Sequence, residues 1–344
     1  MNTNNTLMQR RHNAVPRGVG QIHPIFAERA ENCRVWDVEG REYLDFAGGI
    51  AVLNTGHLHP GIVSAVEAQL KKLSHTCFQV LAYEPYLALC ERMNQKVPGD
   101  FAKKTLLVTT GSEAVENAVK IARAATKRSG AIAFSGAYHG RTHYTLSLTG
   151  KVHPYSAGMG LMPGHVYRAL YPCPLHNISD DDAIASIERI FKNDAAPEDI
   201  AAIIIEPVQG EGGFYAGNPI ACAAALAVLD IFEQENLLQK ANTLGNTLRD
   251  GLMEIAETHR EIGDVRGLGA MIAIELFENG DPGKPNAALT ADIVTRAREK
   301  GLILLSCGPY YNILRILVPL TIEASQIRQG LEIIAQCFDE AKQA

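Results

Sequence analysis

The stretch IIIEPVQGEGGFYAGNP, residues 203–219, decides how the chain is organised. Its three isoleucines, 203–205, predict a buried strand, and the glycine-rich run at 210–213 predicts a tight turn. Asn218 and Pro219 then predict the start of a long helix, because asparagine is a favoured N-cap and proline a favoured first helical residue. Strand, turn and helix therefore follow one another with almost no connector.

Composition argues against several classes of function. The chain has 344 residues, enough for two domains with substantial cores, and its net charge of −6 without a basic tract gives nucleic-acid binding no support. The longest apolar run, 220–229, is too short to span a membrane, and the N-terminus has no apolar core of signal-peptide type. Seven widely spaced cysteines indicate reduced thiols. We therefore expect a cytoplasmic protein with neither a membrane nor a nucleic acid as partner.

Upstream of this stretch, strand and helix patterns alternate. TLLVTT, residues 105–110, predicts a strand; Gly111 and Ser112 form a tight turn, and residues 113–126 predict a helix. Such a turn presents unpaired backbone N–H groups and the positive end of the helix dipole, which suits a phosphate. The same pattern also fits an ordinary strand-to-helix turn, so both interpretations remain open here.

The next predicted strand, 131–135, ends in GAYHGR. Tyr138, His139 and Arg141 would then lie at the carboxyl end of a strand, where open α/β sheets bind ligands. A surface turn with a salt-bridged arginine is one interpretation. The other is a ring-stacking platform beside a guanidinium that binds a carboxylate.

The rest of the chain predicts further elements and no other chemistry except Arg315, on a strand that could face the cleft. His57 and His59 lack a partner at metal-ligand spacing, so they indicate a helix start rather than a metal site. The patterns predict a hairpin at 34–38 and 42–46, helices at 61–73 and from near Glu84, a long loop at 150–178, helices at 181–191, 220–233 and 237–257, a strand at 270–276, a helix at 290–300, strands at 303–305 and 314–317, and a C-terminal helix.

Six motifs, taken together, resemble the class III (ω-) aminotransferases. They are TTGSEAVENAVKIAR, SGAYHGR, IIIEPVQGEGG, GNPIACAAAL, RGLGAMIAIEL and RILVPL, in this order. The resemblance covers nearly the whole chain. It implies the α/β fold of type I (aspartate aminotransferase-like) PLP-dependent transferases, with a small α+β domain, and pyridoxal 5'-phosphate (PLP) as cofactor. It also implies a homodimer or higher oligomer that exchanges the amino group between 4-aminobutyrate and 2-oxoglutarate, giving succinate semialdehyde and glutamate.

The resemblance assigns cofactor contacts to five residues. Gly111 and Ser112 would hold the PLP phosphate at the helix N-terminus. Tyr138 would stack on the pyridine ring with His139 beside it, and Glu206 would lie near the cofactor.

Five further residues would bind the amino-acid and keto-acid substrates. Arg141 would hold the distal carboxylate of 4-aminobutyrate, and Arg315 would hold the α-carboxylate of glutamate or 2-oxoglutarate. Glu211 would pair with Arg315 when no α-carboxylate is present, because an unpaired buried guanidinium is costly. Gln79 would lie near the substrate, and Ile50 would shape the pocket floor.

The chain departs from the family at its catalytic centre. The family has a lysine that binds PLP as a Schiff base and moves protons, and an aspartate in a D-E-V-Q-x-G strand that keeps the pyridine nitrogen protonated. Both belong after Gly213, where this chain continues FYAGNP, and no lysine occurs between Lys192 and Lys240. We therefore expect no catalytic residue, an internal loss on the order of 80 residues, and PLP bound non-covalently at best.

This loss shapes the expected domains. We expect an N-terminal segment of the small domain at 1–55, the remaining PLP-binding large domain at 56–216, and a linking helix with the small domain at 217–344. Part of the large-domain sheet would be missing, leaving the strand at 203–205 with a bare apolar edge. The alternative to an inactive enzyme is a non-catalytic remnant that binds PLP weakly or pairs with an intact subunit. The identity of the preferred ω-amino acid remains open.

Overall fold

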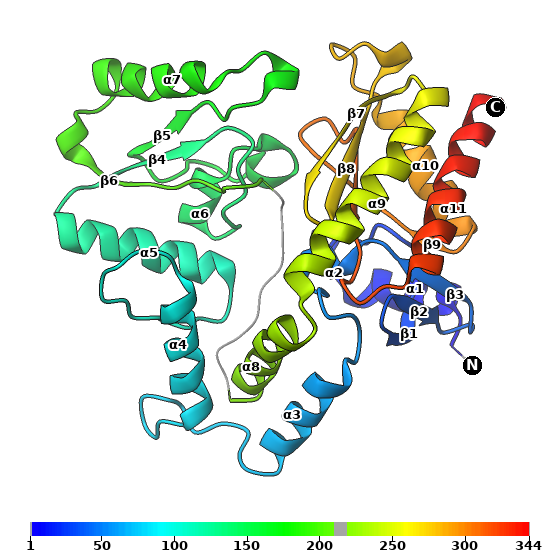
Figure 1. Ribbon diagram of the computed structural model, residues 1–344. Helices are drawn as coiled ribbons and strands as arrows, with labels where there is room; N and C mark the ends of the chain where they lie inside the picture. Colours follow the sequence, from blue (N-terminus) through cyan, green and yellow to red (C-terminus); the bar gives the residue numbers. More distant parts are fainter. Residues whose placement is uncertain (1, 210–218, 344) are drawn as a thin grey trace. The chain divides into compact units, whose positions relative to one another are not determined.

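The computed structural model describes residues 2–209 and 219–343 and divides the chain into two compact units. The first unit comprises residues 1–85 and 222–344, and the second comprises residues 86–221. Figure 1 shows the elements of both units along the chain. The domain boundaries expected from the sequence stay a prediction.

The second unit is built in three layers around a short parallel sheet. Its elements are α5 (Gly111–Thr126), β4 (Gly130–Phe134), α6 (His143–Leu148), β5 (Val166–Ala169), α7 (Asp180–Asn193) and β6 (Ile200–Ile203). Within the described residues the strand order is β5-β4-β6, and both neighbours of β4 run parallel to it. Helix α7 covers one face of the sheet, and α5 and α6 cover the other (Figure 1).

Side chains of β4 alternate between the two helical layers, as the two-residue period of a strand requires. Ile132 and Phe134 pack on the side of α7, whereas Ala131 and Ala133 pack on the side of α5 and α6. Because helices cover both faces, every residue of β4 is buried. This explains why its sequence is continuously apolar.

The prediction of a strand at 105–110 is wrong. These residues pair with no strand among the described parts of the chain. Three side chains spaced four residues apart on α4 (Glu84–Lys96) bind the segment instead: Tyr86, Cys90 and Asn94 hydrogen-bond to its backbone or hydroxyl groups. A strand requires a neighbouring backbone edge, and an apolar run does not show whether one exists.

Two neighbouring predictions also need correction. The predicted loop at 150–178 contains β5, because these four residues find a free edge of β4 to pair with. The strand expected at 203–205 begins earlier and ends at Ile203, since its register is set by β4 rather than by the three isoleucines. In both cases pairing with β4, and not the local composition, determines which residues form the strand.

The first unit combines one mixed sheet and one antiparallel sheet with several helices. One sheet has the order β1-β2-β3-β9 and the other β10-β11-β8-β7. The strands are β1 (Ala27–Glu31), β2 (Arg34–Asp37), β3 (Glu42–Asp45), β7 (Ile262–Leu268), β8 (Met271–Leu276), β9 (Leu302–Ile303), β10 (Leu305–Cys307) and β11 (Ile313–Leu317). The helices are α1 (Asn4–Ala14), α2 (Gly48–Ala51), α3 (Pro60–Leu70), α8 (Pro219–Gln234), α9 (Leu237–Thr258), α10 (Ala287–Glu299) and α11 (Ala324–Gln343).

Most of these elements were predicted. The hairpin of β2 and β3 is antiparallel as expected, and the helical patterns correspond to α3, α4 and α7 to α11. The predicted N-cap of α8, Asn218, lies outside the described residues. Strand β7 was missed, because its glycines at 263 and 267 interrupt the apolar alternation that marks a strand.

The sheet β10-β11-β8-β7 has an apolar face and a polar face. Ile272 and Ile274 of β8, with Leu314 and Ile316 of β11, are buried in the main core of this unit. The residues that alternate with these core positions, including Glu275 and the predicted substrate ligand Arg315, therefore belong to the opposite face. This alternation sets the place of the charged side chains discussed below.

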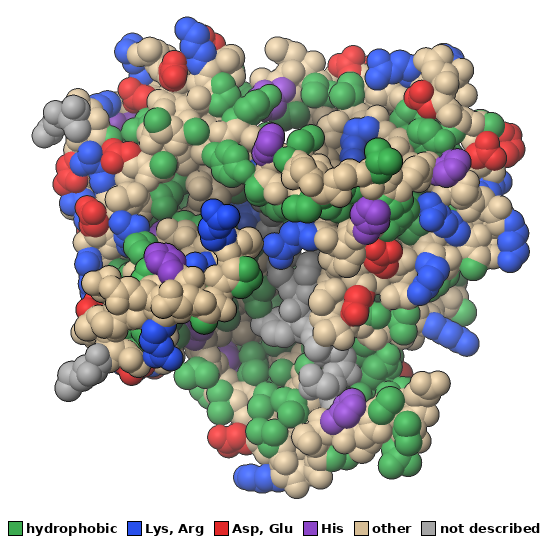
Figure 2. All heavy atoms as spheres, turned by 180° about the vertical axis from the view of Figure 1, so that it is seen from behind, with side chains coloured by type: hydrophobic (Ala, Val, Ile, Leu, Met, Phe, Trp, Pro, Cys, Tyr) green, Lys and Arg blue, Asp and Glu red, His purple; other side chains and the backbone are tan. Residues whose placement is uncertain are grey.

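No described helix is both long and apolar enough to cross a membrane. All seven cysteines are free thiols. His59 is the N-cap of α3 and pairs with Glu235 at 2.9 Å, which confirms the predicted helix start. Basic and acidic side chains are interspersed over the face shown in Figure 2.

Candidate cofactor and substrate site

The N-terminus of α5 offers free backbone donors. Thr110 is the N-cap, its hydroxyl accepts from the Glu113 N–H, and the Glu113 carboxylate accepts from the Thr110 N–H, so the two residues form a capping box. The N–H groups of Gly111 and Ser112 have no acceptor among the described residues. Two donors therefore remain at the positive end of a 16-residue helix.

The loop after β4 lies against this helix end. The backbone N–H of Arg141 donates to Ser112 Oγ over 3.4 Å. Gly140 has a φ of +126°, and a Cβ at this position would lie 2.2 Å from Ser112 Oγ. Only glycine allows this approach. Of the predicted residues, the structure thus brings Gly111, Ser112 and Arg141 together.

A second contact ties the same loop to the end of β6. The Tyr138 N–H donates to Glu206 Oε2 over 3.0 Å, and the Tyr171 hydroxyl donates to the carbonyl of Glu206 over 3.1 Å. The ring of Tyr138 lies 5.2 Å from that of Tyr155, at a tilt of 55°. Lys151 Nζ in turn lies 5.9 Å from the Tyr155 ring centroid. Tyr138 and Glu206 are therefore neighbours.

His139 is buried in this loop, with 6% of its surface exposed. Its backbone N–H donates to Thr149 Oγ1 over 3.1 Å, but its ring Nε2 is buried and has no hydrogen-bond partner among the described residues. Burial, with a smaller contribution from the charge of Arg168, lowers the pKa of His139 to about 4. The imidazole is therefore neutral near pH 7.

This burial predicts an acid-sensitive unit. The folded-state pKa lies below the unfolded value of 6.5, so the unfolded chain binds the proton first as the pH falls. Stability should therefore be lost between about pH 6.5 and pH 4, by up to about 3 kcal/mol. Urea unfolding at several pH values should show a smaller loss for His139→Gln. The exposed His143→Gln is the matched control, and an equal pH dependence in His139→Gln and wild type would refute the assignment.

Two half-buried side chains of the site were not predicted. The Arg168 guanidinium donates to the carbonyls of Ser147 (2.7 Å), Leu148 (2.5 Å) and Thr149 (3.2 Å) at the C-terminal end of α6, where a cation is favoured. Gln209 Nε2 donates to the Ser135 carbonyl over 2.9 Å. Gln209 was visible in the EPVQGEGG motif, whereas Arg168 lay in a segment interpreted as a loop.

The other predicted residues are distributed differently. Ile50, Gln79 and Arg315 belong to the first unit, and Glu211 lies outside the described residues. Gln79 is exposed in a turn. Ile50 has a φ of +60°, a strained conformation for a β-branched residue that costs about 1–2 kcal/mol. Such strain is concentrated at functional sites.

Arg315 is the most distinctive of these residues. It lies on β11, only 5% exposed, and its Nε has no hydrogen-bond partner. No ion pair within the described residues includes it. A buried guanidinium without a counter-charge is costly, so it is well suited to an anionic ligand.

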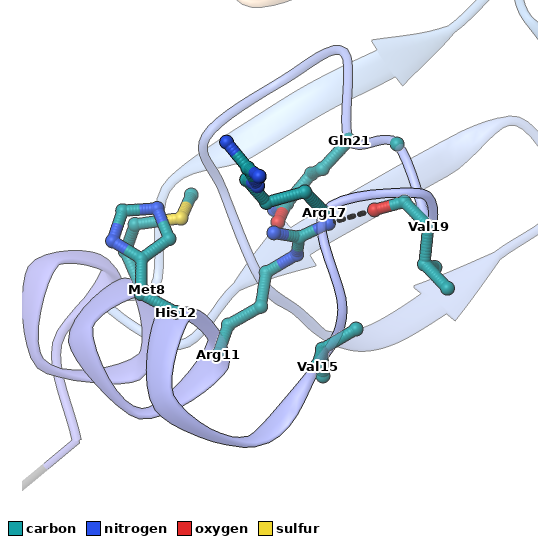
Figure 3. A pocket seen from close by; sticks show the side chains of 8 residues that line it. Met8, Arg11, His12, Val15, Arg17, Val19 and Gln21 are labelled. Atoms are coloured by element: carbon teal, nitrogen blue, oxygen red, sulfur yellow. Dashed lines mark hydrogen bonds between the residues drawn. The ribbon is translucent and has the colours of Figure 1, made fainter. Parts of the chain in front are cut away.

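A separate pocket of about 520 Å³ lies beside α1 (Figure 3). Arg11, His12 and Arg17 contribute to its lining, and Arg11 donates to the Val19 carbonyl (Figure 3). None of the predicted site residues lines it. We therefore assign the site from its chemistry and not from the size of this cavity.

Comparison with known families identifies the chain's family. The profile described as "Aminotransferase class-III" matches residues 14–216 and 214–338. The chain belongs to the class III aminotransferases. The two matches share residues 214–216, so the family pattern breaks off and resumes at the junction where this aminotransferase lacks the expected lysine.

Two relatives show how far the similarity extends. The chain is 70% identical to the 4-aminobutyrate aminotransferase GabT of Escherichia coli (strain K12), over 426 positions and 100% of both chains. It is 58% identical to the 5-aminovalerate aminotransferase DavT of Pseudomonas aeruginosa, covering 98% of this chain and 99% of DavT. Because this aminotransferase has 344 residues, about 82 of the 426 aligned positions are gaps in its sequence.

Solved structures confirm the fold. A Bacillus anthracis aminotransferase matches with a TM-score of 0.88 at 23% identity, covering 99% of this chain and 100% of that one. The ornithine aminotransferase of Toxoplasma gondii matches with a TM-score of 0.82 at 21% identity, covering 99% of this chain and 95% of that one. The aminotransferase thus has the α/β fold of the type I PLP-dependent transferases, as expected.

Proposed function

We propose that this chain derives from a 4-aminobutyrate:2-oxoglutarate aminotransferase and that it does not itself catalyse transamination. The main observation behind this proposal is that no lysine occurs between Lys192 and Lys240. The family match is also interrupted at residues 214–216. The names of its relatives support an ω-amino acid as the ancestral substrate. The absence of membrane-spanning helices among the described residues agrees with the proposed cytoplasmic location.

The residues fit one end of PLP and not the other. Two unpaired N–H groups at α5 and the close approach of Gly140 suit its phosphate, and Tyr138 offers a ring for stacking. The family's lysine and pyridinium aspartate have no counterparts at the junction after Gly213. We therefore propose non-covalent binding and derive no catalytic step.

Arg141 and Arg315 are the proposed carboxylate ligands. Arg141 is exposed beside Ser112, and Arg315 is buried without a counter-charge among the described residues. A guanidinium can bind a carboxylate through two parallel hydrogen bonds, which suits the dicarboxylic and ω-amino acids of the proposed reaction. The roles of Ile50, Gln79 and Glu211 rest on the family resemblance and are proposals as well.

An alternative is a non-catalytic subunit that pairs with an intact homologue. The segment 150–178 favours it, because Leu161 is 94% exposed there and Val152 and Met159 are also exposed. Co-expression with the tagged Escherichia coli relative tests this alternative. Failure of the chain to co-purify removes it.

The proposed binding mode predicts a preference for the phosphate and no covalent product. In equilibrium dialysis PLP should bind more tightly than pyridoxal, which lacks the phosphate. After borohydride reduction, peptide mapping should show no lysine that is modified stoichiometrically. Lys151 is the residue to inspect, since it lies beside the Tyr155 ring, and Lys151→Arg is the control. Stoichiometric modification of a single lysine would overturn the proposal.

A further inference from the structure

Four charged side chains share the polar face of the sheet β10-β11-β8-β7. In the strand register, Arg315 of β11 and Arg266 of β7 both lie opposite Ala273 of β8. Asp264 lies opposite Glu275, two residues further along the same face. Residues paired across antiparallel strands, and those two positions apart on one strand, project to the same face.

Glu275 lies between the two arginines. It is a diagonal neighbour of Arg266 on one side and of Arg315 on the other, and long side chains can meet across such diagonals. Only 1% of its surface is exposed. The carboxylate therefore needs a partner that the protein supplies.

The structure shows which arginine it has joined. Arg266 Nη2 lies 2.7 Å from Glu275 Oε2, and Asn312 Nδ2 donates to Glu275 Oε1 over 3.2 Å. Arg266 also pairs with Asp264. Glu275 is thus paired with Arg266 on the β7 side, and Asn312, the residue before β11, binds its other oxygen.

The arrangement stabilises the charge on Arg266. Burial lowers its pKa, but the hydrogen bond to Asp264 and the charge of Glu275 outweigh burial and raise the pKa above its ordinary value. Arg315, the other cation of this face, has no such partner among the described residues. Its guanidinium is left available for an external anion.

We propose that Arg266 is a positioning residue: it holds Glu275 away from Arg315 and so keeps the Arg315 guanidinium open to a substrate carboxylate. The inference rests on the proposed role of Arg315 as a carboxylate ligand. Without Arg266, the nearest remaining cation on this face is Arg315. Glu275 would then pair with Arg315 and compete with the ligand.

Glutarate, a five-carbon dicarboxylate, is the probe, and its neutral diamide is the matched control ligand. The stabilisation of the chain against heat is measured as a function of glutarate concentration, which gives the dissociation constant by linkage. Arg266→Met should weaken glutarate binding at least about tenfold. The diamide should have no effect on any variant, and Arg315→Met should abolish the glutarate effect.

A second-site variant separates positioning from a general structural role. Arg266→Met combined with Glu275→Gln removes the competing carboxylate, so glutarate affinity should return to within about threefold of wild type. The pair joins a buried carboxylate to an arginine whose side chain is 42% exposed, so removing both charges should be tolerated. Should Arg266→Met not fold, Arg266→Lys keeps a cation but holds two carboxylates less well, and it should show an intermediate loss that Glu275→Gln also reverses.

The outcomes distinguish the two proposals. If wild type shows no glutarate effect, the role of Arg315 in the proposed function fails and the inference with it. If wild type binds but Arg266→Met binds equally well, only the inference is overturned. The same holds if Arg266→Met loses binding and the double variant does not recover it.

Discussion

The 344-residue chain should convert 4-aminobutyrate and 2-oxoglutarate to succinate semialdehyde no faster than free PLP does. A positioned proton-transferring group contributes about 10²–10⁴-fold to a reaction rate, and covalent catalysis adds to this. The chain has no lysine between residues 192 and 240 to perform either role. The measurement is coupled detection of succinate semialdehyde with purified protein and added PLP.

Restoring the missing segment provides the decisive comparison. The intervening residues of the Escherichia coli relative would be inserted at 214–216, where the two family matches overlap. Activity should then rise by at least about 10²–10⁴-fold. The matched control carries the same insert with its Schiff-base lysine replaced by alanine, and it should return to the level of the 344-residue chain. Comparable turnover by the uninserted chain would refute the proposed inactivity.

The same chain should self-associate as its concentration rises. Strand β6 forms an edge of its sheet among the described residues, and Ile203 at its end and Ile205, two residues beyond it, are 52% and 51% exposed. An apolar edge with unpaired backbone groups recruits other strands. Light scattering with size-exclusion chromatography should therefore show large species at micromolar concentrations.

A charge placed on the edge should reverse this behaviour. Ile203→Lys and Ile205→Lys, alone or together, should shift the protein toward monodisperse species, because lysine on an edge strand disfavours pairing. Leu238→Lys adds the same charge at an exposed leucine of α9 and is the control for solubility alone. Monodisperse wild-type protein at high concentration, or equal improvement by Leu238→Lys, would contradict the edge explanation.

Local patterns located most elements correctly because their causes lie within a few residues. The helical pattern at 113–126 identified α5, and the apolar period identified α9 and α11. The segment 105–110 misled for the opposite reason. Its strand-like composition is genuine, but its hydrogen-bond partners are side chains of α4.

The candidate site divides in the same way. Four of the predicted residues belong to the sequence motifs: Gly111, Ser112, Tyr138 and Glu206. In the second unit, Ser112 contacts the loop after β4, and Tyr138 contacts Glu206. Arg168 is far from these motifs in the sequence. Its contribution depends on the packing of β5 beside α6, which no local pattern contains.

The family, the missing lysine and the break in the family pattern follow from the amino-acid sequence, because each is a property of residue identity and order. The pairing of Glu275 with Arg266, the open guanidinium of Arg315 and the neutral buried His139 became visible only in three dimensions. These features depend on strand register and burial among segments far apart in the chain. Packing sets both, and residue identity alone does not encode them.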